Sequence, residues 1–283
     1  MPLLVSEAIV LHAFDYLESS RIVRLVTRDA GVRSGLAKGA RKSRRRFAGG
    51  LDLFSQGTAF LHTKAGRDLD TLSGLEDART RPELGGDLDR FHGAEAIAEI
   101  ALQFGREGAD EELFDAVAGA LDELAAPTGR DAREVTLAGA WRIVAALGFG
   151  PALSECASCD ADVPDETAAL FSHASGGVLC ARCGALAVAT RKLPATARAA
   201  IAGWMSGQPA AVFGDRDARA HQRLLREFLG YHVHDGVVGE GGRALRAFDQ
   251  WERGAWAALV GPPADREGAR PQTRSPTSHT QSQ

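Results

Sequence analysis

Two different hydrophobic periods divide the chain. Over residues 3–76, short β-branched or alternating apolar runs are separated by turn residues, which predicts about five strands. The runs cover residues 8–11, 21–27, 32–38, 51–62 and 69–75. The connections at 29–31 and 63–67 have hairpin length and contain glycine. Five short strands in this length favour a closed OB-fold β-barrel over residues 1–80, because closure removes exposed sheet edges.

From residue 87 onward, the apolar positions recur at the spacing of a helix face instead. Three amphipathic helices are predicted in series, and the glycines and proline at 148–151 end the third. Helical patterning then resumes at residues 195–205, 217–234 and 243–260. Residues 81–260 are therefore predicted to form an all-α helical bundle, which makes the whole chain a multidomain protein with α and β parts.

Two segments of the second half depart from helical patterning. Residues 152–190 hold all four cysteines and are predicted to form a small inserted module. Residues 261–283 contain four prolines among Gln, Ser and Thr, without any apolar period. Burial cannot offset the entropy of ordering such a segment, so we expect a disordered tail.

The cysteines form the most specific pattern in the chain. Two residues separate Cys156 from Cys159, twenty residues follow, and Cys180 and Cys183 repeat the spacing. Such pairs place four thiolates around one tetrahedral ion, which is the arrangement of a structural Zn²⁺ site. Four protein sulfurs leave no coordination position for water or substrate. One structural Zn²⁺ per chain is therefore expected, without a catalytic role.

Other interpretations of these cysteines are weaker. Two disulfides or unrelated buried thiols would also account for them, but a cytosolic protein seldom keeps disulfides. His173 lies between the two pairs and would replace a ligand only if a thiolate were missing. The signature of zinc deaminases is absent, because Glu155 precedes Cys156 and no His-x-Glu occurs.

Composition places the chain among ordinary globular proteins. Hydrophobic residues make up 45% and charged residues 25% of 283, which argues against wholesale disorder. The apolar runs are far shorter than the ~18 residues that a membrane span requires, and the first residues lack the basic start of a signal peptide. We therefore expect a cytoplasmic protein with no membrane partner. Phosphate-binding glycine loops and nucleophile motifs do not occur, so no enzymatic activity is expected.

Positive charge is concentrated near the N-terminus. Residues 1–80 carry 13 Lys and Arg against 9 Asp and Glu, although the whole chain has a net charge of −4. Residues 33–46 contain no acid and hold seven cations: Arg33, Lys38, Arg41, Lys42, Arg44, Arg45 and Arg46. Such a cluster between two strands of a small barrel favours binding to a nucleic-acid phosphate backbone.

Aromatic residues near this cluster could contact bases. Phe47 follows it directly, and we expect its ring to stack on a base. Phe14, Tyr16, Phe54 and Phe60 are also close in the predicted barrel, but core packing is the simpler role for most of them.

These features together resemble the bacterial RecO family of recombination mediators, over roughly residues 1–250. The likeness is carried by Lys38-Gly39-Ala40-Arg41-Lys42, by Phe47-Ala48-Gly49-Gly50-Leu51, by Gly176-Gly177-Val178-Leu179-Cys180-Ala181-Arg182-Cys183 and by the helix at 224–232. The chain departs from the family at 235–242, where a glycine-rich segment replaces a short segment with Arg and Ser. Residues 261–283 are an addition.

The resemblance implies more than the residue patterns do. RecO-like proteins bind single- and double-stranded DNA, anneal complementary strands, and act with RecR and often RecF. They help to load RecA onto DNA coated by single-stranded DNA-binding protein, and some members bind the acidic tail of that coating protein. The resemblance implies DNA contact by Lys38, Arg41, Lys42, Arg44, Arg45 and Arg46, zinc ligation by the four cysteines, and association with the nucleoid.

Two other classes of protein stay open. A zinc-ribbon regulatory protein that binds RNA or one specific duplex would prefer a sequence or 2′-hydroxyls, whereas a mediator would tolerate any single strand. A metal-dependent hydrolase is disfavoured, because the predicted zinc site has no vacant position.

Overall fold

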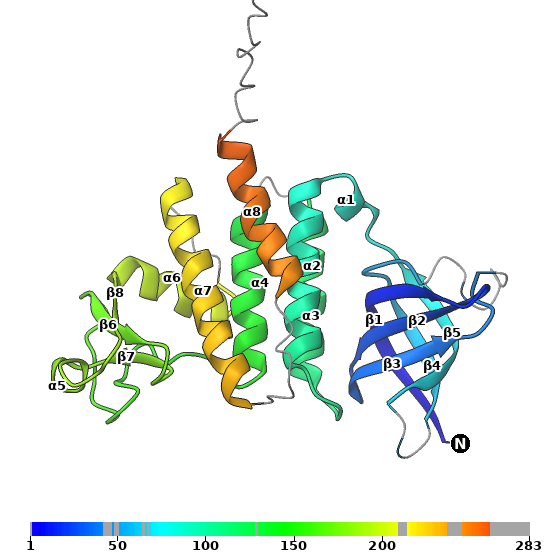
Figure 1. The fold of residues 1–283 in the computed structure, drawn as a ribbon, viewed down its shortest axis with the longest axis horizontal. Coiled ribbons are helices and arrows are strands. Elements are labelled where there is room, and N and C mark those ends of the chain that lie inside the picture. Colours follow the sequence, from blue (N-terminus) through cyan, green and yellow to red (C-terminus); the bar gives the residue numbers. More distant parts are fainter. Residues whose placement is uncertain are drawn as a thin grey trace, which may run out of the picture.

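A computed structural model describes residues 2–41, 47, 51–63, 66, 68–127, 130–208, 214–236 and 245–260. Along the longest axis, a β-barrel lies at one end, helices lie in the middle, and a small three-stranded module lies at the other end (Figure 1). The predicted barrel followed by helices is confirmed. The predicted tail at 261–283 and most of the glycine-rich segment lie outside the described residues. Within the described ranges, no helix has the length and apolar character to cross a membrane.

Five strands close into the barrel in the order β1-β2-β3-β5-β4. They are β1 (Leu3–Tyr16), β2 (Ser20–Thr27), β3 (Gly31–Ala37), β4 (Gln56–His62) and β5 (Asp70–Arg79). β3 and β5 are parallel and the other neighbours antiparallel, as in an OB-fold. The interior is filled by small and branched apolar side chains, among them Ala8, Val10, Val23, Leu25 and Leu61.

The bounds of β1 and β4 differ most from the predicted ones, and β5 ends four residues later than predicted, at Arg79. β1 has 14 residues instead of covering 8–11, because its first half pairs with β4 and its second half with β2. Residues 51–55 form turns instead of extending β4, and Phe54 buries its ring there with a φ of 66°. Tertiary pairing decides both boundaries, and local propensity does not encode it.

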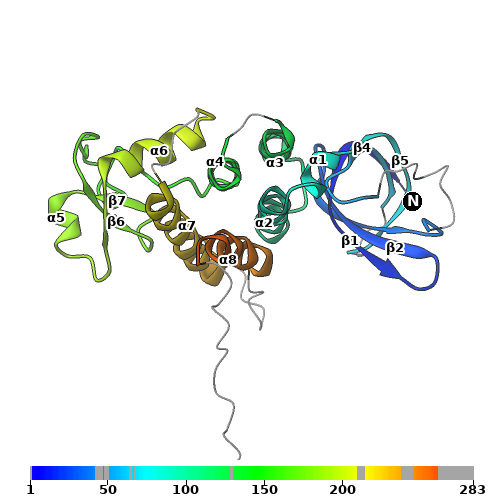
Figure 2. The ribbon, with the colours of Figure 1, turned by 90° about the horizontal axis from the view of Figure 1, so that it is seen from above.

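Helices form the middle of the molecule (Figure 2). They are α1 (Pro82–Gly85), α2 (Leu88–Phe104), α3 (Glu111–Ala125), α4 (Ala132–Ala146), α6 (Ala195–Met205), α7 (Gly214–Gly236) and α8 (Arg246–Val260). α2, α3 and α4 are the three helices predicted in series. Each begins after an aspartate whose carboxylate accepts backbone N–H groups of the first turn: Asp87, Asp110 and Asp131.

The small module consists of β6 (Ala169–Ser172), β7 (Gly177–Leu179), α5 (Ala181–Gly184) and β8 (Arg191–Leu193). Its sheet has the order β7-β6-β8. The apolar core of the module is continuous with that of the helices, since Phe171 and Val178 belong to the same buried cluster as Trp141 and Phe228. The barrel interior forms a separate cluster.

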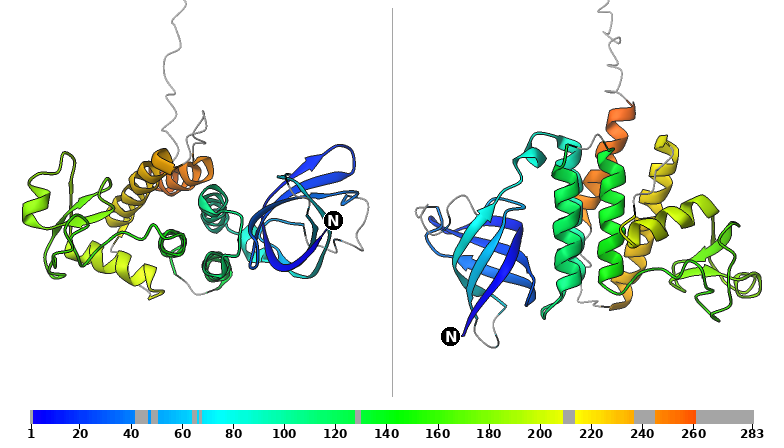
Figure 3. Two further views of the ribbon diagram at one scale, coloured as in Figure 1. Left: turned by 90° about the horizontal axis from the view of Figure 1, so that it is seen from below. Right: turned by 180° about the vertical axis from the view of Figure 1, so that it is seen from behind.

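The barrel lies beside α2 and α3 (Figure 3). Arginine side chains join the barrel to these two helices. The Arg81 side chain is 2% exposed, and it donates to the Phe54 carbonyl at 2.6 Å and to Asp122 at 2.7 Å. Burial lowers the pKa of this guanidinium, and Asp122 compensates its charge. Gly31, at φ 61°, brings the β2–β3 turn so close that a Cβ would collide with the carbonyl oxygens of Arg106 and Gly108.

Candidate nucleic-acid interface and metal site

The four cysteines come together in the small module. Their sulfurs all lie within 4.8 Å of one another, and the sulfurs of Cys159 and Cys180 are 3.8 Å apart. A tetrahedral ion with bonds of about 2.3 Å to sulfur requires sulfur–sulfur separations of about 3.8 Å. All four cysteines are free. The cluster therefore fits a single metal ion, and the disulfide alternative is wrong.

Backbone amides around the cluster favour thiolates. Hydrogen bonds from the backbone of Cys180, and then of Ser158, lower the pKa of Cys156 to about 6. In contrast, the neighbouring thiols of Cys159 and Cys180 raise the pKa of Cys183 to about 12. Thiolates this close repel one another, so all four ionise together only around a cation. The donor set is thus suited to a soft divalent ion.

Arg182 adds a positive charge beside the sulfurs. Hydrogen bonds to Cys159 and Cys183 raise the pKa of its guanidinium. A divalent ion bound by four thiolates keeps a net negative charge, which this guanidinium would partly neutralise. His173 is not part of the cluster: its Nε2 lies 3.1 Å from an Oε2 of Glu227 in α7.

A buried arginine that the sequence analysis missed fixes the loops of the module. Arg198, in α6, is 2% exposed, and its guanidinium donates to the backbone carbonyls of Leu153, Val163, Pro164 and Thr167 and to Asp165. The only signal in the sequence was one cation among the small apolar residues of α6. Its contacts hold the loops on both sides of the first cysteine pair to the helices.

The basic segment begins where β3 ends. Lys38 and Arg41 are exposed, and the backbone N–H of Arg41 donates to the Ser19 carbonyl at 3.1 Å. The Arg41 guanidinium lies 3.7 Å from the carboxylate of Asp15. The other predicted phosphate contacts, Lys42, Arg44, Arg45 and Arg46, lie outside the described residues.

Arg33 does not fit the predicted role of a DNA contact. Its guanidinium lies 2.6 Å from Asp70 and 2.6 Å from Glu107, and the side chain is 14% exposed. Asp70 is itself buried, so moving Arg33 toward a phosphate would leave that carboxylate without compensation. The charge of Arg33 therefore stabilises the barrel and its contact with the helices.

Phe47 does not fit its predicted role either. The ring is 5% exposed and packs in the barrel interior with Leu51 and Leu61. So little of the ring is exposed that its main role in the structure is core packing. Phe54 is buried as well, whereas Phe14 and Tyr16 are 44% and 41% exposed. The sequence could not separate these rings, because the bulge that turns β1 is a tertiary feature.

Most other arginines of the barrel are engaged in internal ion pairs. Arg41 shares Asp15 with Arg21 at the longer distance of 3.7 Å, whereas carboxylates at 2.7–3.1 Å compensate Arg21, Arg28, Arg79 and Arg81. These cations therefore contribute little to attracting a polyanion, because their charges are compensated inside the protein. The segment 38–46 contains no acidic residue, so the local excess of positive charge belongs to it.

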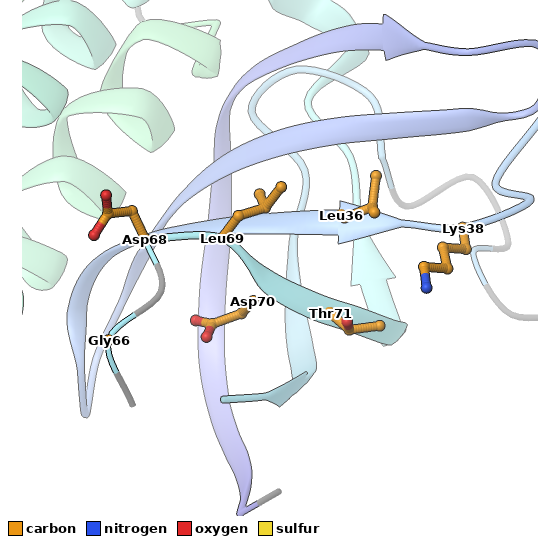
Figure 4. Close-up of a pocket in the computed structure, with 7 residues that line it drawn as sticks. All are labelled: Leu36, Lys38, Gly66, Asp68, Leu69, Asp70 and Thr71. Carbon is orange, nitrogen blue, oxygen red and sulfur yellow. The ribbon is translucent and has the colours of Figure 1, made fainter. Parts of the chain in front are cut away.

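Two open recesses flank the start of this segment. One, of about 470 Å³, lies between β3 and the first residues of β5, with Lys38 at one end and Asp68 at the other (Figure 4). The second, of about 260 Å³, is lined by Arg21, Arg41, Phe47 and neighbouring residues. Both recesses open to the surface.

The chain is a multidomain protein with a closed OB-fold barrel, a helical layer and a four-cysteine module. Residues 1–81 match the family described as Recombination protein O N terminal, and residues 85–238 match Recombination protein O C terminal. The chain therefore belongs to the RecO family, as its sequence motifs predict.

Relatives named DNA repair protein RecO agree with this assignment. The one from Anaeromyxobacter dehalogenans (strain 2CP-C) is 37% identical over 236 residues, which cover 80% of this chain and 89% of the relative. The one from Pelotomaculum thermopropionicum is 32% identical over 238 residues, covering 82% of this chain and 90% of the relative. The one from Rubrobacter xylanophilus is 36% identical over 184 residues, covering 65% of this chain and 72% of the relative.

Proposed function

We propose that the protein is a non-enzymatic mediator of DNA recombination that binds single- and double-stranded DNA and anneals complementary strands. The observation that carries the proposal is the acid-free basic segment that follows β3 of an OB-fold barrel, in a chain of the RecO family. Lys38, Arg41, Lys42, Arg44, Arg45 and Arg46 are the residues assigned to phosphate contact.

Annealing follows from electrostatics alone under this proposal. Each phosphate that a Lys or Arg neutralises releases condensed counterions, so binding tolerates any sequence and weakens steeply with salt. Two strands held near one positive surface repel each other less than they do in solution. No nucleotide hydrolysis is needed, and the protein acts with DNA in the nucleoid.

Membership of the RecO family supports the partners that the sequence motifs lead us to expect. The protein acts with RecR, and with RecF where it is present, to load RecA onto DNA coated by single-stranded DNA-binding protein. The barrel would supply the DNA contacts, while the helices and the module at the far end supply surface for proteins. This division is supported by the length of the molecule, which separates the two ends (Figure 1).

The metal of the module is Zn²⁺, bound by Cys156, Cys159, Cys180 and Cys183. Zinc prefers four thiolates in tetrahedral geometry, and the separations between the sulfurs fit its bond lengths. When bound, the ion would link the segment of Cys156 and Cys159 to the segment of Cys180 and Cys183. With four protein ligands it would have no free coordination position for a substrate. Arg198 and the contacts of Glu227 with His173 and Arg191 hold the module against the helices.

The test is fluorescence anisotropy with two unrelated single strands and one duplex over a salt series. Replacing Arg44, Arg45 and Arg46 with alanine should weaken binding to all sequences alike and lower the single-strand salt slope by about 2. The matched control replaces three exposed helical arginines, Arg216, Arg223 and Arg253, which removes the same charge elsewhere. Equal effects of the two triple variants, or none, would discard the segment as the contact.

The same experiment separates the alternative function. A regulatory protein that binds RNA or one specific duplex would show a strong preference for one sequence or for RNA of the same sequence. Similar affinity for both unrelated single strands supports the mediator instead.

A further inference from the structure

Phe14 and Tyr16 stand on the outside of the barrel. In the second half of β1, Ala13 packs toward the barrel interior, so its neighbour Phe14 points outward, as does Tyr16 two residues later. The two rings are 44% and 41% exposed, and Leu17 at the following turn is 76% exposed. The β1–β2 hairpin thus presents three large apolar side chains in a row.

The helices cover only part of this outer face. Farther from the hairpin turn, Ile9, Leu11 and Val26 belong to the buried apolar cluster of the helices. Arg24, opposite His12, donates to the backbone carbonyl of Leu102 at the end of α2. The covered half therefore ends near the bulge between Val10 and His12, and the rings lie on the open half.

The open half lies directly beside the start of the basic segment. The turn that follows Tyr16 contains Ser19, whose carbonyl accepts the backbone N–H of Arg41 at 3.1 Å. Asp15, between the two rings in sequence, lies 3.7 Å from the Arg41 guanidinium and 3.0 Å from that of Arg21. Exposed aromatic faces and the entry to an acid-free basic segment therefore share one corner of the barrel.

We propose that Phe14 and Tyr16 form a stacking platform for the bases of single-stranded DNA, whose phosphates contact Lys38 and Arg41. The assignment rests on the proposed DNA-binding function and gives that site its preference between strand types. Base–aromatic stacking works with every base, so it suits a protein that must tolerate any sequence. In a duplex the base faces are covered by their neighbours, so the rings contribute only to single strands.

The test compares the Phe14→Ala/Tyr16→Ala variant with the unaltered protein. The probes are a labelled oligothymidylate and a labelled duplex, measured by anisotropy at one salt concentration and then across a series. We expect at least about thirtyfold weaker single-strand binding, since the loss of stacking costs at least about fivefold at each of the two rings. Duplex affinity should change by less than about twofold. The single-strand salt slope should stay the same, because no phosphate contact is removed.

Two matched variants accompany it. Leu3→Ala/Val5→Ala removes two apolar side chains of similar exposure, 52% and 48%, from the other end of the same strand, and should leave both affinities unchanged. Phe14→Tyr/Tyr16→Phe exchanges the rings and should keep single-strand binding within about twofold. Thermal unfolding curves check that every variant is folded; both altered rings are exposed, so little stability should be lost.

The outcomes separate this inference from the proposed function. Unchanged single-strand affinity in the alanine variant, or an equal loss for single strands and duplex, would overturn the stacking platform while DNA binding stands. Failure of the unaltered protein to bind either probe at low salt would overturn the proposed function, and the platform with it.

Discussion

Two buried arginines, Arg198 and Arg81, connect the helices to the cysteine module and to the barrel. Arg198 serves four backbone carbonyls and one carboxylate with a single guanidinium, and Arg81 joins a barrel carbonyl to a carboxylate of α3. Five N–H donors in a planar fork make such sharing possible, and an ammonium group cannot reproduce it. Each arginine therefore contributes to stability through the hydrogen bonds that its position allows, and not through its charge alone.

Replacing Arg198 with lysine keeps the charge and removes the fork. Several carbonyls would lose their donor in a site that is 2% exposed, so we expect the free energy of unfolding to fall by about 2–4 kcal/mol. Urea denaturation followed by circular dichroism measures the change. The control is Arg223→Lys, at an exposed position of α7, which should stay within about 0.5 kcal/mol. Equal stability of the two variants would contradict a structural role for the fork.

His221 gives the helices a dependence on pH. It is 7% exposed against the ring of Trp204, and burial lowers its pKa to about 4 from 6.5. The unfolded chain therefore binds a proton between pH 6.5 and 4 that the folded chain does not. Stability from this residue is complete above pH 6.5 and is lost as the pH falls toward 4, by up to about 3 kcal/mol.

The measurement is urea denaturation of the unaltered protein and of His221→Phe at several pH values between 7 and 4. Phenylalanine keeps the ring and cannot bind a proton, so the stability of the variant relative to the unaltered protein should rise steadily as the pH falls. Protonation of other groups cancels in this difference. A difference that stays constant over the range would show that the imidazole is not held neutral.

At the scale of elements, the N-terminus of α8 is capped by a residue of another helix, α2. The carboxylate of Glu99 in α2 accepts the backbone N–H groups of Arg246 and Phe248 at 2.8 and 2.9 Å. Phe248 and Trp251 are buried beneath the helix. The cap that most helices find in the preceding residue comes here from a residue 147 positions earlier in the chain.

Replacing Glu99 with glutamine removes the charge and half of this cap. We expect amide hydrogen exchange in α8 to become faster, by an opening free energy about 1–2 kcal/mol lower, while amides of α4 stay protected. Hydrogen-exchange mass spectrometry resolves the two helices. Glu166→Gln, at an exposed loop position, serves as the control and should leave α8 unchanged. Equal exchange of α8 in both variants would mean that its apolar contacts alone hold it.

How far the sequence predicts the structure also differs between elements. The spacing of the four cysteines predicts the metal cluster because two short knuckles fix the geometry locally. The apolar positions that predict α2, α3 and α4 also lie within each helix's own sequence, so these helices are predictable as well. The length of β1 and the burial of Phe47 depend on strands and turns distant in sequence, so no window of residues contains them. The pairing of Arg33 with Asp70, 37 residues away, is hidden for the same reason.

At the scale of the whole molecule, the two separate apolar cores determine which parts unfold when one part is destabilised. The barrel interior is one core, while the helices and the cysteine module share the other, which includes Cys156 itself. Loss of the metal should therefore loosen the module and the helices packed on it before it reaches the barrel. The DNA contacts proposed here lie on the barrel, at the opposite end of the molecule (Figure 1).

This arrangement predicts separate consequences for Cys156→Ser. Under the proposed metal binding, which contributes directly to folding, the variant should lose metal, and the thermal midpoint of the helical core should fall by at least about 5 °C. Binding to a short duplex at 25 °C should stay within about threefold, because the barrel core is intact. Metal content, calorimetry and anisotropy on the same sample measure the three quantities. If duplex binding were lost in a variant whose barrel is still folded, the metal module would have to contact DNA itself or influence the barrel through the helices that lie between them.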